Sequence, residues 1–272
     1  RKENLNMDLS AFDLKGKVAL ITGGAHGIGF SIAVGMASCG ATVCFNCSNE
    51  GSLEKGLAAY KEAGVDAHGY VADVTDEAAV NAMVAKIKEE VGPVDILVNN
   101  AALQSNYTFD QYDEAGFDLI IRTNLGGYFN CVKAALPYLK ESPYGRVINL
   151  GSVHSEMPAR FDPVYAMSKG AIRAFTREVS LALGKYGVTA NLIMPAGVDI
   201  EFKTDVHEMI RPIAEREYRK LPPARHFHRH VFCIERNGKP EDIAGMTCYL
   251  ASDAASHVSG ACIAVDGGFL IT

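Results

Sequence analysis

The stretch "KVALITGGAHGIG", residues 17–29, decides the fold of this chain. Its first seven residues form an apolar run typical of a buried strand, and residues 31–40 follow the pattern of a helix that ends at a glycine. The turn between them holds four glycines. Glycine at such a turn lets the backbone approach a pyrophosphate, whose charge the N-terminus of the helix stabilises. The stretch therefore predicts dinucleotide binding.

Strands and helices alternate from this stretch to the end of the chain. The apolar runs that predict strands are residues 17–23, 41–46, 66–73, 94–101, 145–152, 188–196 and 262–268. The helical patterns cover residues 31–40, 52–64, 76–92, about 113–141 and 165–187. This alternation implies crossover connections and a parallel sheet covered on both faces. We therefore expect an α/β fold, a single-domain, Rossmann-like, doubly wound parallel sheet of about seven strands.

The composition of the whole chain excludes several classes of protein. A hydrophobic fraction of 48% is ordinary for a globular protein. The net charge of −6 and the pI of 5.8 argue against nucleic-acid binding, which needs a basic surface. No apolar run reaches the length of about 18 residues that a membrane helix requires. The first ten residues lack the apolar segment of a secretory signal.

The seven cysteines are scattered through apolar segments and show no framework spacing. An odd number of cysteines without an export signal predicts reduced thiols and a cytoplasmic location. Cys44 and Cys47 form a C-x-x-C pattern, but it ends a strand and has no second pair nearby. We therefore expect neither a metal site nor a redox role for this pair.

The stretch "YAMSK", residues 165–169, places a tyrosine and a lysine four residues apart on one predicted helix, so both lie on the same face. A tyrosine hydroxyl titrates near pH ~10 in isolation, and an adjacent ammonium lowers its pKa toward the range of proton exchange. Taken alone, the pair also fits a core aromatic beside a solvated lysine. The surrounding motifs decide between the two interpretations.

Those motifs are spread over nearly the whole chain. They are the glycine spacing T-G-x-x-x-G-x-G at 22–29, "DV" at 73–74, "NNAA" at 99–102, "TNLGGYF" at 123–129, and a serine, Ser152, 13 residues before Tyr165. In these features the sequence resembles the short-chain dehydrogenase/reductase family. The resemblance implies an NAD(P)-dependent oxidoreductase that interconverts a secondary alcohol and a ketone by hydride transfer.

The resemblance also implies a set of site residues. The catalytic residues would be Asn124, Ser152, Tyr165 and Lys169. Tyr165 would exchange the proton, Ser152 would hydrogen-bond the substrate oxygen, and Lys169 would bind the nicotinamide ribose, while Asn124 would hold a water that relays protons. The implied cofactor contacts are Gly23, His26, Gly27, Ile28, Gly29, Cys47, Ser48, Asp73, Val74, Asn100, Ala101, Ala102, Tyr165, Lys169, Pro195 and Val198.

Three positions depart from the family pattern. Ala102 replaces the last glycine of N-N-A-G, and Ala196 replaces a glycine after the sixth strand. Ile200 stands where a threonine commonly binds the nicotinamide carboxamide. The first two changes add one methyl group each, so they predict small shifts in close contacts. The third leaves open how the carboxamide is held, although Thr204 is a nearby alternative.

The choice of cofactor turns on the end of the second strand. An acid there would bind the ribose 2′-hydroxyl and repel a 2′-phosphate. Cys47 and Ser48 occupy those positions, and both are small and neutral. His26 stands at a loop position that is often basic in NADP-binding relatives. We therefore expect NADP(H), with NAD(H) as the alternative.

Two segments stand apart from the regular alternation. Residues 1–15 are interpreted as an N-terminal extension, and residues 16–272 as the dinucleotide-binding catalytic domain. Within that domain, residues 197–240 are rich in charge, histidine and proline and predict a lid. The cluster "HFHRH" at 226–230 has histidines two apart and no nearby acidic ligand, so no metal site is expected.

The substrate side is predicted from weaker signals. His154 and Glu156 follow Ser152 and are candidates for substrate contact. Within the family the chain resembles sugar-acid and polyol dehydrogenases of the gluconate 5-dehydrogenase kind, and the cations of the lid are compatible with an acidic substrate. The alternatives are a 3-oxoacyl-carrier or hydroxysteroid reductase and, in another class, a non-catalytic NAD(P)-binding sensor. The resemblance further implies a homotetramer, with a dimer as the alternative.

Overall fold

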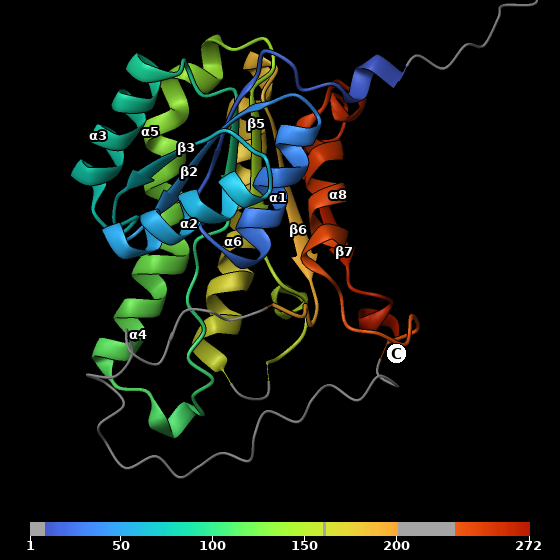
Figure 1. Ribbon diagram of the computed structural model, residues 1–272. Helices are drawn as coiled ribbons and strands as arrows, with labels where there is room; N and C mark the ends of the chain where they lie inside the picture. Colours follow the sequence, from blue (N-terminus) through green and yellow to red (C-terminus); the bar gives the residue numbers. More distant parts are fainter. Residues whose placement is uncertain (1–8, 160–161, 201–231) are drawn as a thin grey trace, which may run out of the picture.

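The computed structural model describes residues 9–159, 162–200 and 232–272. A seven-stranded parallel sheet in the order β3-β2-β1-β4-β5-β6-β7 forms its centre (Figure 1). The strands are β1 (Val18–Ile21), β2 (Thr42–Cys47), β3 (Ala67–Val71), β4 (Ile96–Asn99), β5 (Arg146–Leu150), β6 (Thr189–Pro195) and β7 (Cys262–Val265). The predicted fold class is confirmed.

Helices cover both faces of this sheet. The helices are α1 (Gly27–Ser38), α2 (Glu50–Glu62), α3 (Glu77–Glu90), α4 (Glu114–Ile121), α5 (Gly127–Glu141), α6 (Pro163–Leu183) and α8 (Pro240–Ala251). Side chains of α1, α2 and α8 enter one hydrophobic cluster, and side chains of α3, α5 and α6 enter another. The sheet lies between the two clusters, because alternate residues of each strand point to opposite faces.

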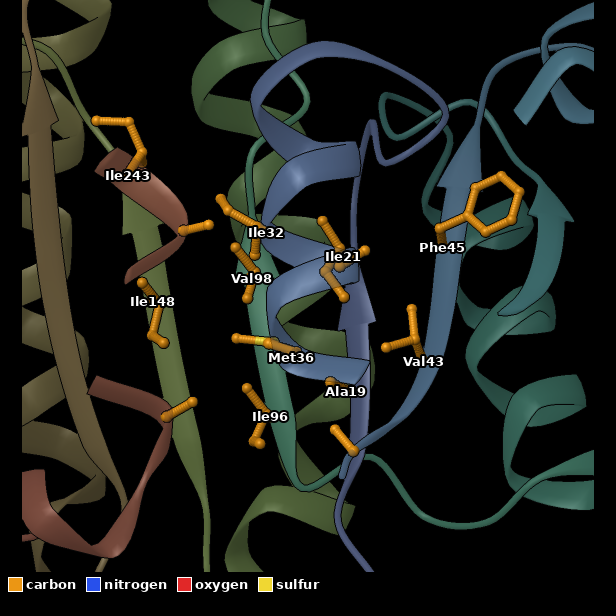
Figure 2. Packing of buried hydrophobic residues seen from close by; sticks show 14 of the residues in the cluster. Ala19, Ile21, Ile32, Met36, Val43, Phe45, Ile96, Val98, Ile148 and Ile243 are labelled. Carbon is orange, nitrogen blue, oxygen red and sulfur yellow. The ribbon is translucent and has the colours of Figure 1, made fainter. Parts of the chain in front are cut away.

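The first cluster shows how β1 packs against α1 (Figure 2). Ala19 and Ile21 of β1 contact the core on the side of α1, where Ile32 and Met36 are completely buried. Helix α1 also packs closely on α8 at Gly35, where a Cβ atom would lie 3.2 Å from Cys248 Sγ. A side chain larger than hydrogen at this position would push the two helices apart.

The strand order places the site. β1 pairs with β2 on one side and with β4 on the other, so the chain reverses its direction of travel across the sheet between β1 and β4. In open α/β sheets, ligands bind beyond the carboxyl ends of the strands at such a switch point. The loops after β1, β4 and β5 meet at this edge.

The structure differs from the sequence expectations in two elements. The single helix expected over about 113–141 is interrupted by a π-helical turn, Arg122–Gly126, between α4 and α5. Helix α8 was not predicted, although Pro240 at its first turn and the acids Glu241 and Asp242 are ordinary helix-start signals.

Several expectations fall partly or wholly outside the described ranges. Most of the expected lid, residues 197–240, lies there, including "HFHRH". Of the N-terminal extension, residues 9–15 are described, and Leu14 is fully buried against the domain. Among the described helices, none combines the length and apolar character that a membrane crossing requires. Within the same residues, no three potential metal ligands of the His, Cys, Asp or Glu type gather at one point.

Candidate active site

The structure brings together the four residues that the sequence predicted as catalytic. Tyr165 and Lys169 occupy consecutive turns of α6, and the Lys169 Nζ lies 5.5 Å from the centre of the Tyr165 ring. Lys169 is only 2% exposed, and its Nζ donates a hydrogen bond to the Leu150 carbonyl at 2.8 Å. The lysine is therefore a buried group of the site and not a solvated helix charge.

Ser152 approaches the same tyrosine from the end of β5. It is the N-cap of a short 3₁₀ helix, Val153–Ser155, and its Oγ accepts a hydrogen bond from the His154 N–H at 3.2 Å. The Ser152 hydroxyl also faces the Tyr165 phenol closely enough to lower its pKa. Two hydroxyl groups thus converge at the carboxyl edge of the sheet.

Asn124 lies in the π-helical turn between α4 and α5 and is fully buried. Its Nδ2 donates hydrogen bonds to the Leu103 carbonyl at 2.9 Å and to Ser168 Oγ at 3.0 Å. Its Oδ1 accepts from the Leu103 N–H at 2.7 Å. π-Helical turns occur frequently at functional sites, where they redirect one side chain out of the regular helical pattern. The amide is a fixed part of the site.

The pKa values of the Tyr–Lys pair differ from the expectation. The sequence predicted that the Lys169 ammonium lowers the pKa of Tyr165. In the structure burial dominates and raises the pKa of Tyr165 to about 12, against the lowering effect of the Ser152 hydroxyl. Burial also lowers the pKa of Lys169 to about 7. The protein alone therefore keeps the phenol protonated at neutral pH.

The glycine loop after β1 has the geometry of an anion-binding turn. Gly23 and Gly27 have φ values of +63° and +60°, a region that favours glycine. A Cβ atom on Gly29 would lie 2.5 Å from both Asn100 Nδ2 and the Gly23 carbonyl oxygen. His26 occupies the N-cap of α1, but no side-chain cap is made there by the described residues. The first N–H groups of α1 therefore point to the loop without a capping side chain.

Neighbouring side chains hold this loop in place. Asn100 Nδ2 donates to the carbonyls of Thr22 and Gly23 at 2.9 and 3.1 Å. The Tyr60 hydroxyl, on α2, donates to the Gly24 carbonyl at 2.7 Å. The sequence predicted Asn100 but missed Tyr60, because nothing in the linear pattern links the middle of α2 to the first turn.

The other predicted cofactor residues lie along the carboxyl edge with different exposures. Cys47 is buried and its thiol approaches the Tyr70 carbonyl, whereas Ser48 is exposed. Asp73 is exposed and Val74 is buried. The remaining members are Ile28 on α1, Ala101 and Ala102 after β4, Pro195 at the end of β6 and Val198 just beyond it.

The departures from the family pattern also lie near the cofactor end. Ile200 lies close to the glycine loop. A Cβ atom placed on Gly27 would be 2.9 Å from the Ile200 Cγ2. Ala196 packs at the edge of a small apolar cluster formed by Val153, Phe232 and Phe269. This cluster joins the segment after Ser152 to the C-terminal end of the chain.

The two predicted substrate contacts have different surroundings. The His154 ring lies edge-on to the Tyr165 ring, with ring centres 6.3 Å apart, and burial lowers the pKa of His154. Glu156 instead forms an ion pair with Arg173 of α6 at 3.1 Å. His154 therefore lies beside the reactive phenol, whereas Glu156 is engaged by another side chain.

Tyr128 is a second residue that sequence reasoning missed. It lies on α5, one turn after Asn124, and its hydroxyl donates to the Leu150 carbonyl at 2.9 Å. Lys169 donates to the same carbonyl, and its Nζ is 5.5 Å from the centre of the Tyr128 ring. The spacing of four residues from Asn124 was the available signal.

Comparison with known proteins agrees with this geometry. A family model described as short chain dehydrogenase matches residues 17–211. The 2-dehydro-3-deoxy-D-gluconate 5-dehydrogenase of Formosa agariphila is 32% identical over 267 residues, which cover 98% of this chain and 97% of that protein. The 3alpha-hydroxysteroid dehydrogenase of Mediterraneibacter gnavus is 34% identical over 256 residues, which cover 93% of this chain and 97% of that protein.

Solved structures show the same likeness. A gluconate 5-dehydrogenase from Burkholderia cenocepacia, in complex with NADP and tartrate, matches with a TM-score of 0.84 at 30% sequence identity. The match covers 97% of this chain and 98% of that one. The similarity therefore extends over the sheet, the glycine loop and the catalytic helix together.

Proposed function

The chain belongs to the short chain dehydrogenase family and is an NAD(P)-dependent oxidoreductase, and from this premise we propose that it interconverts a secondary alcohol and a ketone on a sugar acid or polyol. The observation that carries the proposal is the convergence of Ser152, Tyr165 and Lys169 at the switch-point edge of the sheet. If Tyr165 were only a core aromatic, Lys169 would be a solvated surface charge. Lys169 is instead only 2% exposed.

Proton transfer is the contribution of Tyr165 in this proposal. A reduced nicotinamide, when bound at this edge, would supply the hydride for the carbonyl carbon. Tyr165 donates its phenolic proton to the carbonyl oxygen, so that one hydride and one proton convert the ketone to the alcohol. With a pKa of about 12 in the protein without bound cofactor, the Tyr165 phenol carries its proton at neutral pH and can donate it. For the oxidation the phenolate must form, and a neighbouring positive charge favours it.

The other three residues orient and stabilise. The Ser152 hydroxyl hydrogen-bonds the substrate oxygen and stabilises the charge that develops on it. Lys169, with its Nζ on the Leu150 carbonyl, holds the ribose side of the cofactor and replaces the proton that Tyr165 gives up. Asn124 keeps one lone pair of Oδ1 for the water that relays protons, because its other contacts are made by Leu103 and Ser168.

The residues at the cofactor end fit a dinucleotide. A Cβ atom at Gly23, Gly27 or Gly29 would lie 3.0 Å or less from other protein atoms, so glycine at these positions keeps the turn tight. The uncapped first turn of α1 offers N–H groups to a pyrophosphate. We assign NADP(H) as the preferred cofactor. Ser48 presents a neutral, exposed hydroxyl at the end of β2, and the gluconate 5-dehydrogenase of similar structure was solved with NADP. NAD(H) is the alternative.

The substrate class follows from the relatives and from the surroundings of Tyr165. The sugar-acid dehydrogenase of Formosa agariphila aligns over almost the whole chain. His154, neutral and next to Tyr165, supplies a polar contact suited to a hydroxyl-rich substrate. A hydroxysteroid is the second candidate substrate, since the sequence identity to the steroid dehydrogenase is 34%, against 32% for the sugar-acid dehydrogenase.

The assembly and location complete the proposal. We assign a homotetramer, supported by the exposed apolar side chains Phe117, Phe129 and Leu181 on α4, α5 and α6. A cytoplasmic location is supported by the seven cysteines, all of which are free thiols.

A turnover assay tests the proposal. Purified protein is mixed with 5-ketogluconate and either NADPH or NADH, and loss of the reduced cofactor is followed by absorbance. We expect oxidation of NADPH, a loss on the order of 100-fold or more in Tyr165→Phe, and no loss in Tyr186→Phe, which changes an exposed tyrosine. Turnover of a steroid but not of a ketogluconate would move the assignment to the second candidate. Tyr165-independent turnover would overturn the mechanism.

A further inference from the structure

A carboxylate at the start of the catalytic helix has more partners than a helix cap requires. Asp162 is the N-cap of α6, and its Oδ1 accepts a hydrogen bond from the Tyr165 N–H at 3.0 Å. One such bond satisfies an N-cap. Asp162 is nevertheless 0% exposed, which is rare for an aspartate unless other donors compensate the burial.

Those donors come from the loop between β4 and α4. Asp162 Oδ2 accepts from the Ser105 N–H at 2.8 Å, the Ser105 hydroxyl at 3.0 Å and the Asn106 N–H at 2.9 Å. The Tyr112 hydroxyl donates to Oδ1. An ionised carboxylate only accepts hydrogen bonds, and Asp162 is the acceptor in every one of these contacts. A neutral side chain with a donor group could not reproduce all of them.

The same loop also holds Asn124. Residues 103–112, here called the active-site loop, begin with Leu103, whose backbone N–H and carbonyl both bind the Asn124 amide. Asn106 has a φ of 59°, and among the described residues it is the only one other than glycine with a positive φ. Its N–H is bound by Asp162, so the unusual backbone conformation is stabilised by that carboxylate.

We propose that Asp162 is a positioning residue of the active site, whose carboxylate joins the active-site loop to the first turn of α6 and keeps a negative charge beside Tyr165. The active-site loop then connects two catalytic residues: Leu103 of the loop binds Asn124, and Ser105 and Asn106 bind Asp162 at the start of the helix that carries Tyr165. The assignment rests on the proposed function, which makes Tyr165 the proton donor.

The charge has a consequence for the phenol. Among the residues that the structure describes, the groups that face Tyr165 are Lys169 on α6, Ser152 and His154 after β5, Tyr128 on α5, and Asp162. Among these, the negative charge of Asp162 raises the pKa of Tyr165, in addition to the larger effect of burial. Removing the charge while keeping the shape therefore makes the phenolate easier to form.

Two variants test the charge and the contacts. Asp162→Asn removes the charge, keeps one acceptor oxygen and turns the other acceptor into a donor, whereas Tyr112→Phe removes one donor and keeps the charge. Asp76→Asn is the control, since Asp76 caps the exposed start of α3 with bonds to the Ala78 and Ala79 N–H groups. Asparagine is also a good N-cap, so this control leaves helix capping intact.

The first measurement needs no substrate. Tyr165 is titrated by NMR in protein carrying ¹³C-labelled tyrosine, and its signal is assigned by its loss in Tyr165→Phe. We expect the phenol to titrate at lower pH in Asp162→Asn than in the wild type, and at the wild-type pH in Tyr112→Phe and Asp76→Asn. An unchanged titration in Asp162→Asn would overturn the charge part of the proposal, whatever the enzyme turns over.

The second measurement is the pH profile of alcohol oxidation, taken well below the melting temperature of each variant. We expect kcat to fall by on the order of 10-fold or more in Asp162→Asn, with KM little changed, because the reacting groups are misplaced. The acid limb of the profile is expected to move to lower pH. A lower melting temperature with unchanged kcat and an unchanged acid limb would reduce Asp162 to a structural cap and overturn the proposal. If the wild type turns over no substrate while the NMR shift is present, the proposed function fails and the effect of Asp162 on Tyr165 stands.

Discussion

Asn124 and Leu103 form a reciprocal pair of hydrogen bonds, in which the Asn124 amide binds both the N–H and the carbonyl of one backbone residue. The two distances are 2.7 and 2.9 Å. The amide thus substitutes for a strand partner at a point where the chain has left β4. This contact ties the conformation of the active-site loop to the π-helical turn of Arg122–Gly126.

The first prediction concerns this pair. We expect Asn124→Ala to lower the free energy of unfolding by about 1–3 kcal/mol, because two partly buried backbone groups of Leu103 lose their partner. Activity is expected to fall more than stability alone explains. Denaturant unfolding and steady-state kinetics measure the two effects.

The matched control for this variant is Asn191→Ala. Asn191 is fully buried and makes the same kind of clamp, to the Val258 carbonyl at 2.7 Å and the Ala261 N–H at 3.1 Å. Its loss is expected to destabilise the fold by a similar amount and to leave kcat unchanged. Equal losses of kcat in both variants would show that the Asn124 contact matters only for folding.

The second prediction uses the burial of Lys169. Its pKa of about 7 in the folded chain lies below its ordinary value of 10.5, so between these pH values the unfolded chain binds more protons. Stability therefore rises with pH across this window in the wild type. In Lys169→Met this pH-dependent contribution is absent. The stability of the variant relative to the wild type is therefore expected to increase as the pH falls from 10 toward 7. Melting temperatures of both proteins at matched pH values test the sign, and a difference that does not vary with pH would contradict it.

The third prediction concerns the glycine loop. In Gly29→Ala the new methyl group would lie 2.5 Å from Asn100 Nδ2 and from the Gly23 carbonyl oxygen, so the turn must open. We expect weaker binding of NADPH in calorimetric titration, by on the order of 10-fold, which corresponds to about 1.4 kcal/mol. The control is Gly245→Ala, where a Cβ atom meets nothing within 4 Å inside α8. That variant is expected to be more stable than the wild type by up to about 1 kcal/mol and to bind NADPH normally.

The fourth prediction concerns the opposite edge of the sheet. Lys17 and Arg146 are each only 3% exposed, and both contact Asp253 Oδ1, at 3.1 and 3.2 Å. Asp253→Asn leaves two buried cations without this counter-charge. Because the Asp253 side chain is itself 44% exposed, water partly replaces it, and we expect a loss on the order of 2 kcal/mol in the free energy of unfolding.

A surface ion pair provides the comparison. Lys133 and Glu77 approach to 2.7 Å, but both side chains are more than half exposed. Glu77→Gln is therefore expected to change stability by less than about 1 kcal/mol. If Asp253→Asn proves as mild as Glu77→Gln, the two buried cations are compensated by water and not by Asp253.

The parts of the fold that were predictable from sequence depend on local pattern. The run Val18–Ile21 is apolar and buried on both faces, and Gly23 and Gly27 after it adopt positive φ values, which glycine tolerates at a tight turn. Tyr165 and Lys169 share a helix face because four residues make about one turn. Such relationships follow from spacing along the chain and need no knowledge of distant contacts.

The remainder depends on contacts between distant segments. In sequence, Asp162 is an ordinary helix cap. The groups of the active-site loop that donate hydrogen bonds to it lie 50 to 57 residues earlier in the chain. The sign of the change in the pKa of Tyr165 depends on burial, which the spacing to Lys169 does not reveal. The π-helical turn likewise interrupts a continuous helical pattern, because the Asn124 side chain is held by Leu103 and Ser168.

The position of β1 between β2 and β4 has a consequence for biosynthesis. A ribosome releases β1, β2 and β3 first, and these three form one half of the sheet with an unpaired edge on β1. That edge is covered only when β4, whose register begins at Ile96, has left the exit tunnel. The nascent chain therefore carries the glycine loop on an open strand edge for the translation of roughly a quarter of its length, at about 5–20 residues per second. An early-bound dinucleotide or a chaperone that covers this edge would protect the chain during that interval.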